Sequence, residues 1–213
     1  RGRDRNAITK EMTSGGKLAD FDQEAFLKSE FVSKYWDARV FGNTFLEKDG
    51  NKGYIKTGVV QFGVGISISP VNIIRQTNTN KAGVQEGKNA GMAPLAFRVV
   101  EHGVYCMPFF VNYARKSGCT ADDIELLKLL IPQAYDMNRS AIRPDVRLRH
   151  AWYIEHKNLL GSCPDYMLLD ALTPERIGDV SEPSESWHDY KDKTELPEEL
   201  LHKVAGIVDL VCL

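Results

Sequence analysis

The residues near the start of the chain that are best suited to chemistry are an acid and a base two positions apart. They are Asp37 and Arg39, within the run Trp36–Gly42. In an extended chain both side chains would lie on one face, with the large apolar side chains on the other. Burying such a pair is costly unless the two charges satisfy each other. The run is therefore expected to be a structural ion-pair lock, or a binding element in which Arg39 also reaches a ligand.

The sequence contains no recognisable catalytic motif. It has no Walker phosphate loop, no H-E-x-x-H and no G-x-S-x-G. The histidines and cysteines lack metal-ligand spacing, and the cysteines are expected to be free thiols: His102, His150, His156, His188, His202, Cys106, Cys119, Cys163 and Cys212. These observations favour a binding protein without catalytic residues, metal or cofactor.

The charge of the chain is unevenly distributed. The net charge is −2, with 43% hydrophobic and 26% charged residues, as in ordinary globular proteins. Residues 1–160 carry 23 Lys and Arg against 17 Asp and Glu, whereas residues 161–213 carry 4 against 12. This asymmetry predicts a basic, working body followed by an acidic tail. No apolar run of membrane-spanning length and no leader is apparent, so a cytoplasmic location is expected.

The clearest periodic signal runs from Thr57 to Ser69, where apolar residues alternate with small or polar ones. The apolar positions predict the core face of a strand. The opposite face is nearly bare because it contains Gly63 and Gly65. Either a ligand approaches the backbone there, beside Gln61 and Ser67, or the strand is bulged or bent.

A long polar segment from Asn72 to Pro94 contains Arg75, Lys88 and, near its far end, the apolar Met92. A loop of this length in a compact domain is usually functional or disordered. It is expected to be a nucleic-acid element in which Met92 wedges between stacked bases, or else a mobile surface hairpin.

The densest basic run begins at Arg139 and continues through Ser140 and Arg143. In the strand expected to follow, Arg147, Arg149 and Tyr153 share one face. Arginines beside an aromatic residue suit phosphate and base contacts, although a solvated charged face is the alternative.

Two helices and a tail complete the expected organisation. Apolar spacing predicts helices over 22–35 and over 120–131, the second beginning with a capping box at Thr120–Asp123. Residues 176–213 are expected to be an acidic linker followed by an amphipathic helix from Leu200 to Val211.

The order of several motifs resembles the repeated backbone subunit of type I CRISPR surveillance (Cascade) complexes, within the RAMP superfamily. The resemblance covers about residues 30–165. It rests on Trp36–Gly42, Gly58–Gln61 leading into Ser67, Gly91–Met92, Gly103–Tyr105 and Arg139–Arg143.

This resemblance implies an α+β fold: an RRM/ferredoxin-like palm over residues 1–175, with a β-hairpin thumb at about 75–94 and inserted finger segments. It implies a non-catalytic, multicopy subunit that binds CRISPR guide RNA along its length and forms the helical backbone of the complex. The other expected partners are target DNA paired to the guide, further copies of the chain and other Cascade subunits. The expected RNA contacts are Arg39, Gln61, Ser67, Arg75, Lys88, Met92, Arg139, Ser140 and Arg143.

Two alternative functions remain open. Related RNA-binding subunits cut guide precursor or target RNA, so an RNA endonuclease with Asp37 as the first acid to test is one alternative. The other is a protein-interaction module that binds no RNA.

Overall fold

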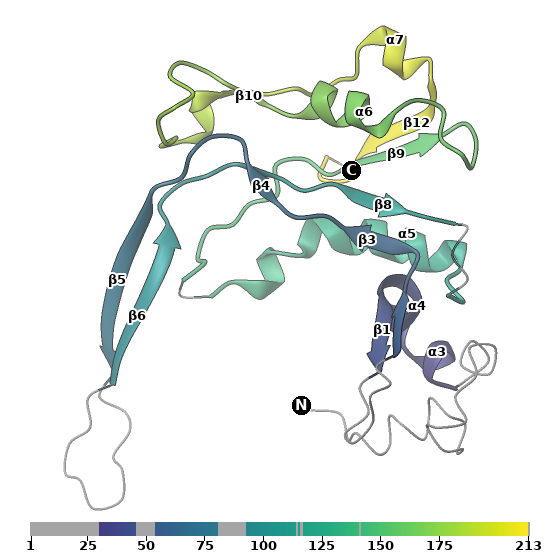
Figure 1. The fold of residues 1–213 in the computed structure, drawn as a ribbon, viewed down its shortest axis with the longest axis horizontal. Coiled ribbons are helices and arrows are strands. Elements are labelled where there is room, and N and C mark those ends of the chain that lie inside the picture. Colours follow the sequence, from purple (N-terminus) through teal and green to yellow (C-terminus); the bar gives the residue numbers. More distant parts are fainter. Residues whose placement is uncertain are drawn as a thin grey trace, which may run out of the picture. The chain divides into compact units, whose positions relative to one another are not determined.

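The computed structural model of the chain describes residues 30–45, 54–80, 93–113, 115, 117–140 and 142–212 (Figure 1). The chain divides into two compact units, which are described separately. Unit 1 comprises Arg1–Gly63, Pro108–Gln133 and Asp209–Leu213, and unit 2 comprises Val64–Met107 and Ala134–Val208. No helix among the described residues is long and apolar enough to cross a membrane.

Unit 1 combines short helices with two antiparallel strand pairs, β1 with β2 and β3 with β8. Val40 and Val60 are its most deeply buried large side chains. Its elements are α3 (Glu30–Lys34), α4 (Trp36–Phe41), β1 (Gly42–Phe45), β2 (Tyr54–Thr57), β3 (Val60–Phe62), β8 (Phe109–Val111), α5 (Ala121–Leu130) and η2 (Ile131–Gln133).

The run that contains Asp37 and Arg39 is helical, so the extended geometry considered for it is wrong. Asp37 lies in the first turn of α4, where a carboxylate interacts favourably with the helix dipole. Gly42 ends the helix with φ 88°, and its N–H donates to the carbonyl of Ala38. Helical spacing buries Ala38 and Val40 together.

The alternating segment from Thr57 to Ser69 is interrupted, so the prediction of one continuous core face over its full length is wrong. β3 ends at Phe62, and β4 (Ile66–Ser67) begins after three irregular residues. Val64 is 79% exposed and Ile66 is 69% exposed. At Gly63 an added β-carbon would lie 2.9 Å from Cγ of Pro108. The close approach at this glycine is therefore made by the chain itself.

Unit 2 consists of small two-stranded sheets with short helices. Strand β4 pairs with β7, β5 with β6 and β10 with β11, all antiparallel, and β9 pairs with β12. The elements are β4, β5 (Ile73–Asn80), β6 (Ala93–Val100), β7 (Tyr105–Cys106), η3 (Asp136–Asn138), β9 (Trp152–His156), α6 (Asp165–Leu172), β10 (Glu175–Arg176), η4 (Trp187–Asp189), β11 (Tyr190–Lys191), α7 (Glu198–Leu201) and β12 (Val204–Asp209), whose last residue belongs to unit 1.

The predicted amphipathic helix from Leu200 to Val211 is wrong. Only Glu198–Leu201 are helical, and Val204–Asp209 form strand β12. The β-branched residues in this stretch favour an extended chain, and pairing with β9 satisfies its backbone. A buried cluster packs two leucines of α6 against residues of the segment that was expected to be a linker. Its members are Leu168 and Leu172 of α6 and Leu196, Leu200 and Val204 of that segment.

A second buried contact also ties the acidic segment into unit 2. Oγ of Ser69 lies 2.6 Å from the hydroxyl of Tyr190, which donates to Oγ of Ser184 at 2.8 Å. Nδ1 of His102 lies 2.8 Å from the same Ser184 oxygen. His102, for which the sequence suggested no partner, thus has a structural partner in Ser184. The domain boundary expected at residue 175 stays a prediction.

The mixture of helices and small antiparallel sheets agrees with an α+β fold. The assignment of these elements to an RRM-like palm and a thumb stays a prediction.

Candidate nucleic-acid interface

A hollow of about 350 Å³ lies within unit 2. It is lined by Ala134, Tyr135, Asn138, Arg143 and Val146. Tyr135 supplies an aromatic ring, Asn138 an amide and Arg143 a guanidinium group. Ligand pockets typically begin at about 300 Å³, so the hollow is large enough for one small planar group.

Local hydrogen bonds build this hollow from residues close in sequence. Asn138 donates from its backbone to the carbonyl of Tyr135 at 3.1 Å and from Nδ2 to the carbonyl of Ala134 at 2.8 Å. Ser140 and Arg143 then form an isolated bridge, with N to O distances of 3.4 and 2.9 Å. This reversal returns Arg143 to the side of Tyr135 and Asn138.

The side chains of the hollow match the parts of a nucleotide. Aromatic rings stack on bases with little sequence preference, and guanidinium groups bind phosphate in a bidentate manner. An asparagine amide carries both donors and an acceptor for a base edge or a sugar hydroxyl. The hollow therefore offers the side-chain types that contact bases and phosphates in single-stranded nucleic acids.

Arg143 differs from its basic neighbours in its electrostatic environment. Arg139 is paired with Asp136, and Arg147 is paired with Asp145, each at 2.7 Å and with both side chains exposed. Within the part of the chain that the structure describes, no such pair is formed by Arg143. Exposed pairs contribute little stability and break readily, so Arg139 also remains available to an anion.

Two expectations about this basic region need correction or restriction. The strand predicted to begin beside Arg147 starts only at Trp152, and Tyr153 is 7% exposed rather than lying on an open face with the arginines. Arg149 instead lies over the ring of Trp187, 4.9 Å from its centroid. Oγ of Ser140 is buried without a hydrogen-bond partner among the described residues.

The two strands at the ends of the polar segment expected to be a thumb pair regularly with each other. Strands β5 and β6 run side by side over eight residue pairs, from Ile73 opposite Val100 to Asn80 opposite Ala93 (Figure 1). Arg75 is exposed on this hairpin. Lys88 and Met92 lie outside the described residues, so their predicted contacts stay predictions.

Arg39 belongs to unit 1 and its guanidinium group is almost fully engaged. It donates to both carboxylate oxygens of Asp123, at 2.9 and 2.7 Å, and to the carbonyls of Val32 and Ser33, both at 2.8 Å. The lock considered for Arg39 therefore exists, with Asp123 rather than Asp37 as its partner. Oδ1 of Asp37 accepts from the N–H of Ala38.

The remaining expected contacts lie on separate strands. Gln61 in β3 is opposite Phe110 of β8, which is 44% exposed. Ser67 in β4 is opposite Tyr105 of β7, which is also partly exposed. Gln61 and Ser67 belong to different units, so the structure does not join them in one site.

His156 contacts two residues that the sequence did not connect with it. Its Nδ1 accepts from the N–H of Ser162 at 3.0 Å and lies 3.1 Å from Ser162 Oγ, while Nε2 lies 3.2 Å from Oδ1 of Asp165. Because the amide donates to Nδ1, the ring proton lies on Nε2, directed at the carboxylate. The three groups close the turn after β9 and also offer residue types used in general acid–base chemistry.

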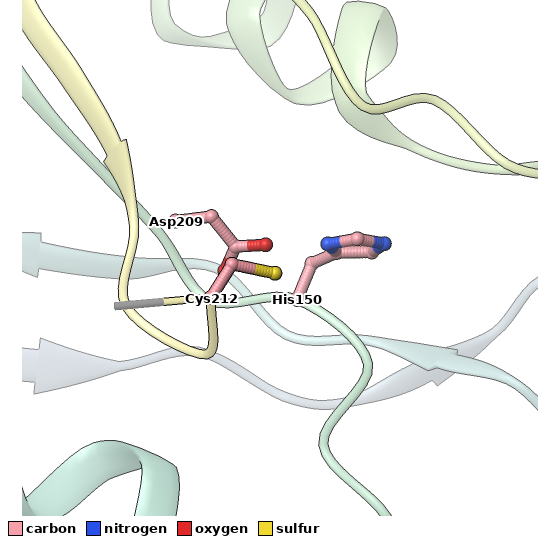
Figure 2. A group of neighbouring side chains, drawn as sticks. All are labelled: His150, Asp209 and Cys212. Atoms are coloured by element: carbon pink, nitrogen blue, oxygen red, sulfur yellow. The ribbon is translucent and has the colours of Figure 1, made fainter.

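Figure 2 shows three side chains of metal-binding type, His150, Asp209 and Cys212. Asp209 and Cys212 belong to unit 1, and a hydrogen bond and the charge of the carboxylate raise the pKa of the Cys212 thiol. A raised pKa disfavours the thiolate that a metal requires. His150 belongs to unit 2, where its Nε2 lies 3.0 Å from Oδ2 of Asp192. These residues are therefore not assigned to a metal site.

Tyr135 and Asn138 lie before the basic run, and sequence patterns gave no reason to select them. Only the turn that brings Arg143 back beside them places all three in one hollow. The class of protein defined by these features is an α+β protein with a polar hollow that contains an arginine and an aromatic ring.

The family model for CRISPR-associated protein Cas7 matches residues 3–195. Because the match covers most of the sequence, the chain belongs to this family, as its motif order indicated. The protein is thus a CRISPR-associated, RNA-binding subunit of the RAMP type that acts with CRISPR RNA and other Cas subunits. No curated protein matches the sequence.

Proposed function

We propose that the protein is a non-catalytic scaffold that binds CRISPR guide RNA along its length, with several copies on each guide. The copies form the backbone of a Cascade-type complex, and the bases left accessible pair with target DNA. In such a division of labour base pairing reads the sequence, while the protein holds the nucleic-acid backbone.

The observation that carries this proposal is the position of Arg143 in a hollow beside Tyr135 and Asn138. A cation with no acidic partner among the described residues, next to an aromatic ring, is the combination that holds a nucleotide without reading its identity. Such a site suits a scaffold that must accept any guide sequence. Arg39 is left out of the proposed interface because its donors are occupied by Asp123 and two carbonyls.

A pair of matched single substitutions tests the role of the hollow. Arg143→Ala is expected to weaken binding of single-stranded guide RNA by about tenfold, the effect of losing one charge-assisted contact. Lys203→Ala is the control, because it removes an exposed positive charge that lies outside the basic run. Filter binding at fixed salt provides the measurement. Equal affinities for the two variants would contradict the assignment of the hollow.

A double substitution tests the wider basic turn. Arg139→Ala combined with Arg143→Ala is expected to prevent assembly on guide RNA, because it removes two cations from the turn that the Ser140–Arg143 bridge closes. Size-exclusion chromatography with labelled RNA measures assembly. If the double variant still assembles like the unmodified protein, the turn from Arg139 to Arg143 is not the interface.

Cleavage assays separate the scaffold from the endonuclease alternative. We expect repeat RNA and complementary target RNA to stay intact on incubation with the protein, with and without Mg²⁺. Should cleavage occur, Asp37→Ala and His156→Ala are the variants to compare, since these residues offer a carboxylate and a hydrogen-bonded imidazole. Cleavage that disappears in either variant would replace the scaffold with an enzyme.

A further inference from the structure

The hairpin β5–β6 contains two arginines placed directly opposite each other. Arg75 of β5 is the register partner of Arg98 of β6. Directly opposed residues in an antiparallel pair have their side chains on the same face, with β-carbons about 5 Å apart. They are the only charged residues in the sequences of the two strands, IIRQTNTN and APLAFRVV. The hairpin thus concentrates two positive charges at one rung.

The arginine face of the hairpin is open. Arg75 and Arg98 are exposed, and the neighbouring rung on the same face pairs Ile73 and Val100, which are 60% and 41% exposed. On the opposite face Ile74, Phe97 and Val99 are only partly exposed. A large ligand can therefore approach the two guanidinium groups without first displacing a side chain packed over them.

No described residue neutralises this pair. Neither arginine forms an ion pair or a side-chain hydrogen bond with another residue in the described ranges, whereas Arg39, Arg139 and Arg147 each have a carboxylate partner. Like charges facing each other across an antiparallel pair destabilise it. Among the described residues, no third strand joins the β5–β6 sheet to offset that repulsion. An anion between the two groups would convert the repulsion into attraction.

We propose that Arg75 and Arg98 form a phosphate clamp, in which two guanidinium groups on one face of the hairpin hold a single phosphodiester group of a nucleic-acid strand. Guanidinium groups present paired N–H donors that match phosphate oxygens, and two of them converging on one phosphate fix its position. The site rests on the proposed function and deepens it. It adds Arg98, and it assigns Arg75 to a shared contact with one phosphate rather than to a separate contact.

The phosphate can belong to the guide RNA or to the target DNA, and binding measurements distinguish these sources. Arg75→Ala, Arg98→Ala and the double variant are compared on single-stranded RNA, single-stranded DNA of the same sequence and the RNA–DNA duplex. Lys191→Ala with Lys203→Ala is the control, because it removes two exposed charges outside the hairpin. A loss confined to RNA identifies a guide phosphate, and a loss confined to DNA or to the duplex identifies a target phosphate.

The clamp predicts a specific salt dependence. Each single variant is expected to weaken binding by about tenfold, and the double variant by little more, because either loss opens the same site. The slope of log affinity against log salt should fall by about 0.7 in the double variant on a single strand, the value for one phosphate. Additive single effects with twice that change in slope would show two separate phosphates and overturn the clamp.

A charge reversal guards against misfolding as the cause. Arg75→Glu replaces the repulsion at this rung with an attraction, so hydrogen exchange in the hairpin should slow while nucleic-acid binding is lost. If the variants bind like the lysine control, the clamp is wrong but the proposed function stands. If the unmodified protein binds none of the three nucleic acids, the proposed function itself is wrong.

Discussion

Arg39 and Asp123 are 84 positions apart in the sequence and form a bidentate ion pair, with Nη2 of the arginine 2.7 Å from Oδ1 of the aspartate. The same carboxylate accepts from the N–H of Thr120 at 2.9 Å, which completes the capping box of α5. Trp36 donates from Nε1 to the carbonyl of Asp123 at 3.1 Å. One aspartate thus caps α5 and fastens it to α4.

Removing the Asp123 carboxylate should destabilise unit 1 severely. Asp123→Ala leaves Arg39 without its partner and α5 without half of its cap, and breaking a largely buried pair costs about 3–5 kcal/mol. Side-chain exposures of 18% for Arg39 and 7% for Asp123 place the expected loss toward the lower end of that range. Asp122→Ala is the control, because Asp122 is exposed in the same turn. Urea unfolding measures the difference, and equal stabilities would show that the pair is not a lock.

The same carboxylate should make stability depend on acid pH. The hydrogen bond from Arg39 is the main cause that lowers the pKa of Asp123, and burial opposes it. The pKa of Asp123 is therefore lower in the folded protein than in the unfolded chain, where it is about 3.9. The ionised carboxylate stabilises the fold fully above the unfolded pKa, and this stabilisation is lost as pH falls through the folded pKa. The difference in unfolding free energy between the unmodified protein and Asp123→Asn should therefore be constant near neutral pH and shrink below about pH 4. A difference that persists unchanged to the lowest pH would contradict this linkage.

Gly58 is expected to be irreplaceable for steric reasons. A β-carbon there would collide with backbone atoms of Val40, Phe41 and Gly42, at the corner between α4 and β1. Gly58→Ala should therefore cost roughly 1–3 kcal/mol or more, as overpacking does. Gly65→Ala is the matched control, since the nearest atom to its added carbon is 3.9 Å away, and it should change stability by less than about 0.5 kcal/mol. Thermal unfolding distinguishes the two, and similar melting temperatures would disprove the steric argument.

The hydroxyl of Tyr190 should stabilise unit 2 through its two serine partners. Tyr190→Phe leaves the buried Ser69 and Ser184 hydroxyls short of a hydrogen-bond partner, which costs about 1–3 kcal/mol. Tyr166→Phe removes an exposed hydroxyl and should have almost no effect. Chemical denaturation measures the stabilities of Tyr190→Phe and Tyr166→Phe. If Tyr190→Phe were as stable as the control, the acidic segment would not depend on this contact.

Local signals in the sequence predicted several parts of the structure correctly. The capping box at Thr120 identified the start of α5, because its residues are close together in the chain. The family was likewise recognised from the order of short motifs. The motif Trp36–Gly42 was singled out correctly, but its ion pair was assigned to Asp37 because the true partner is distant in sequence.

Other features depended on contacts that the sequence does not display. The stretch from Leu200 to Val211 has helical spacing, yet pairing with β9 makes part of it a strand. Tyr153 alternates with the arginines in sequence, but packing buries it. The opposition of Arg75 and Arg98 cannot be read from the sequence, because twenty-two residues separate them and only the pairing of β5 with β6 defines which residues are opposite each other.

The most direct test of the central claim counts the protein copies bound to guide RNAs by native mass spectrometry. Three RNAs are compared, the second twice as long and the third three times as long as the first. A multicopy scaffold predicts that the number of bound copies rises in proportion to RNA length, with the RNA recovered intact. A single copy at every length, or cleaved RNA, would contradict the account.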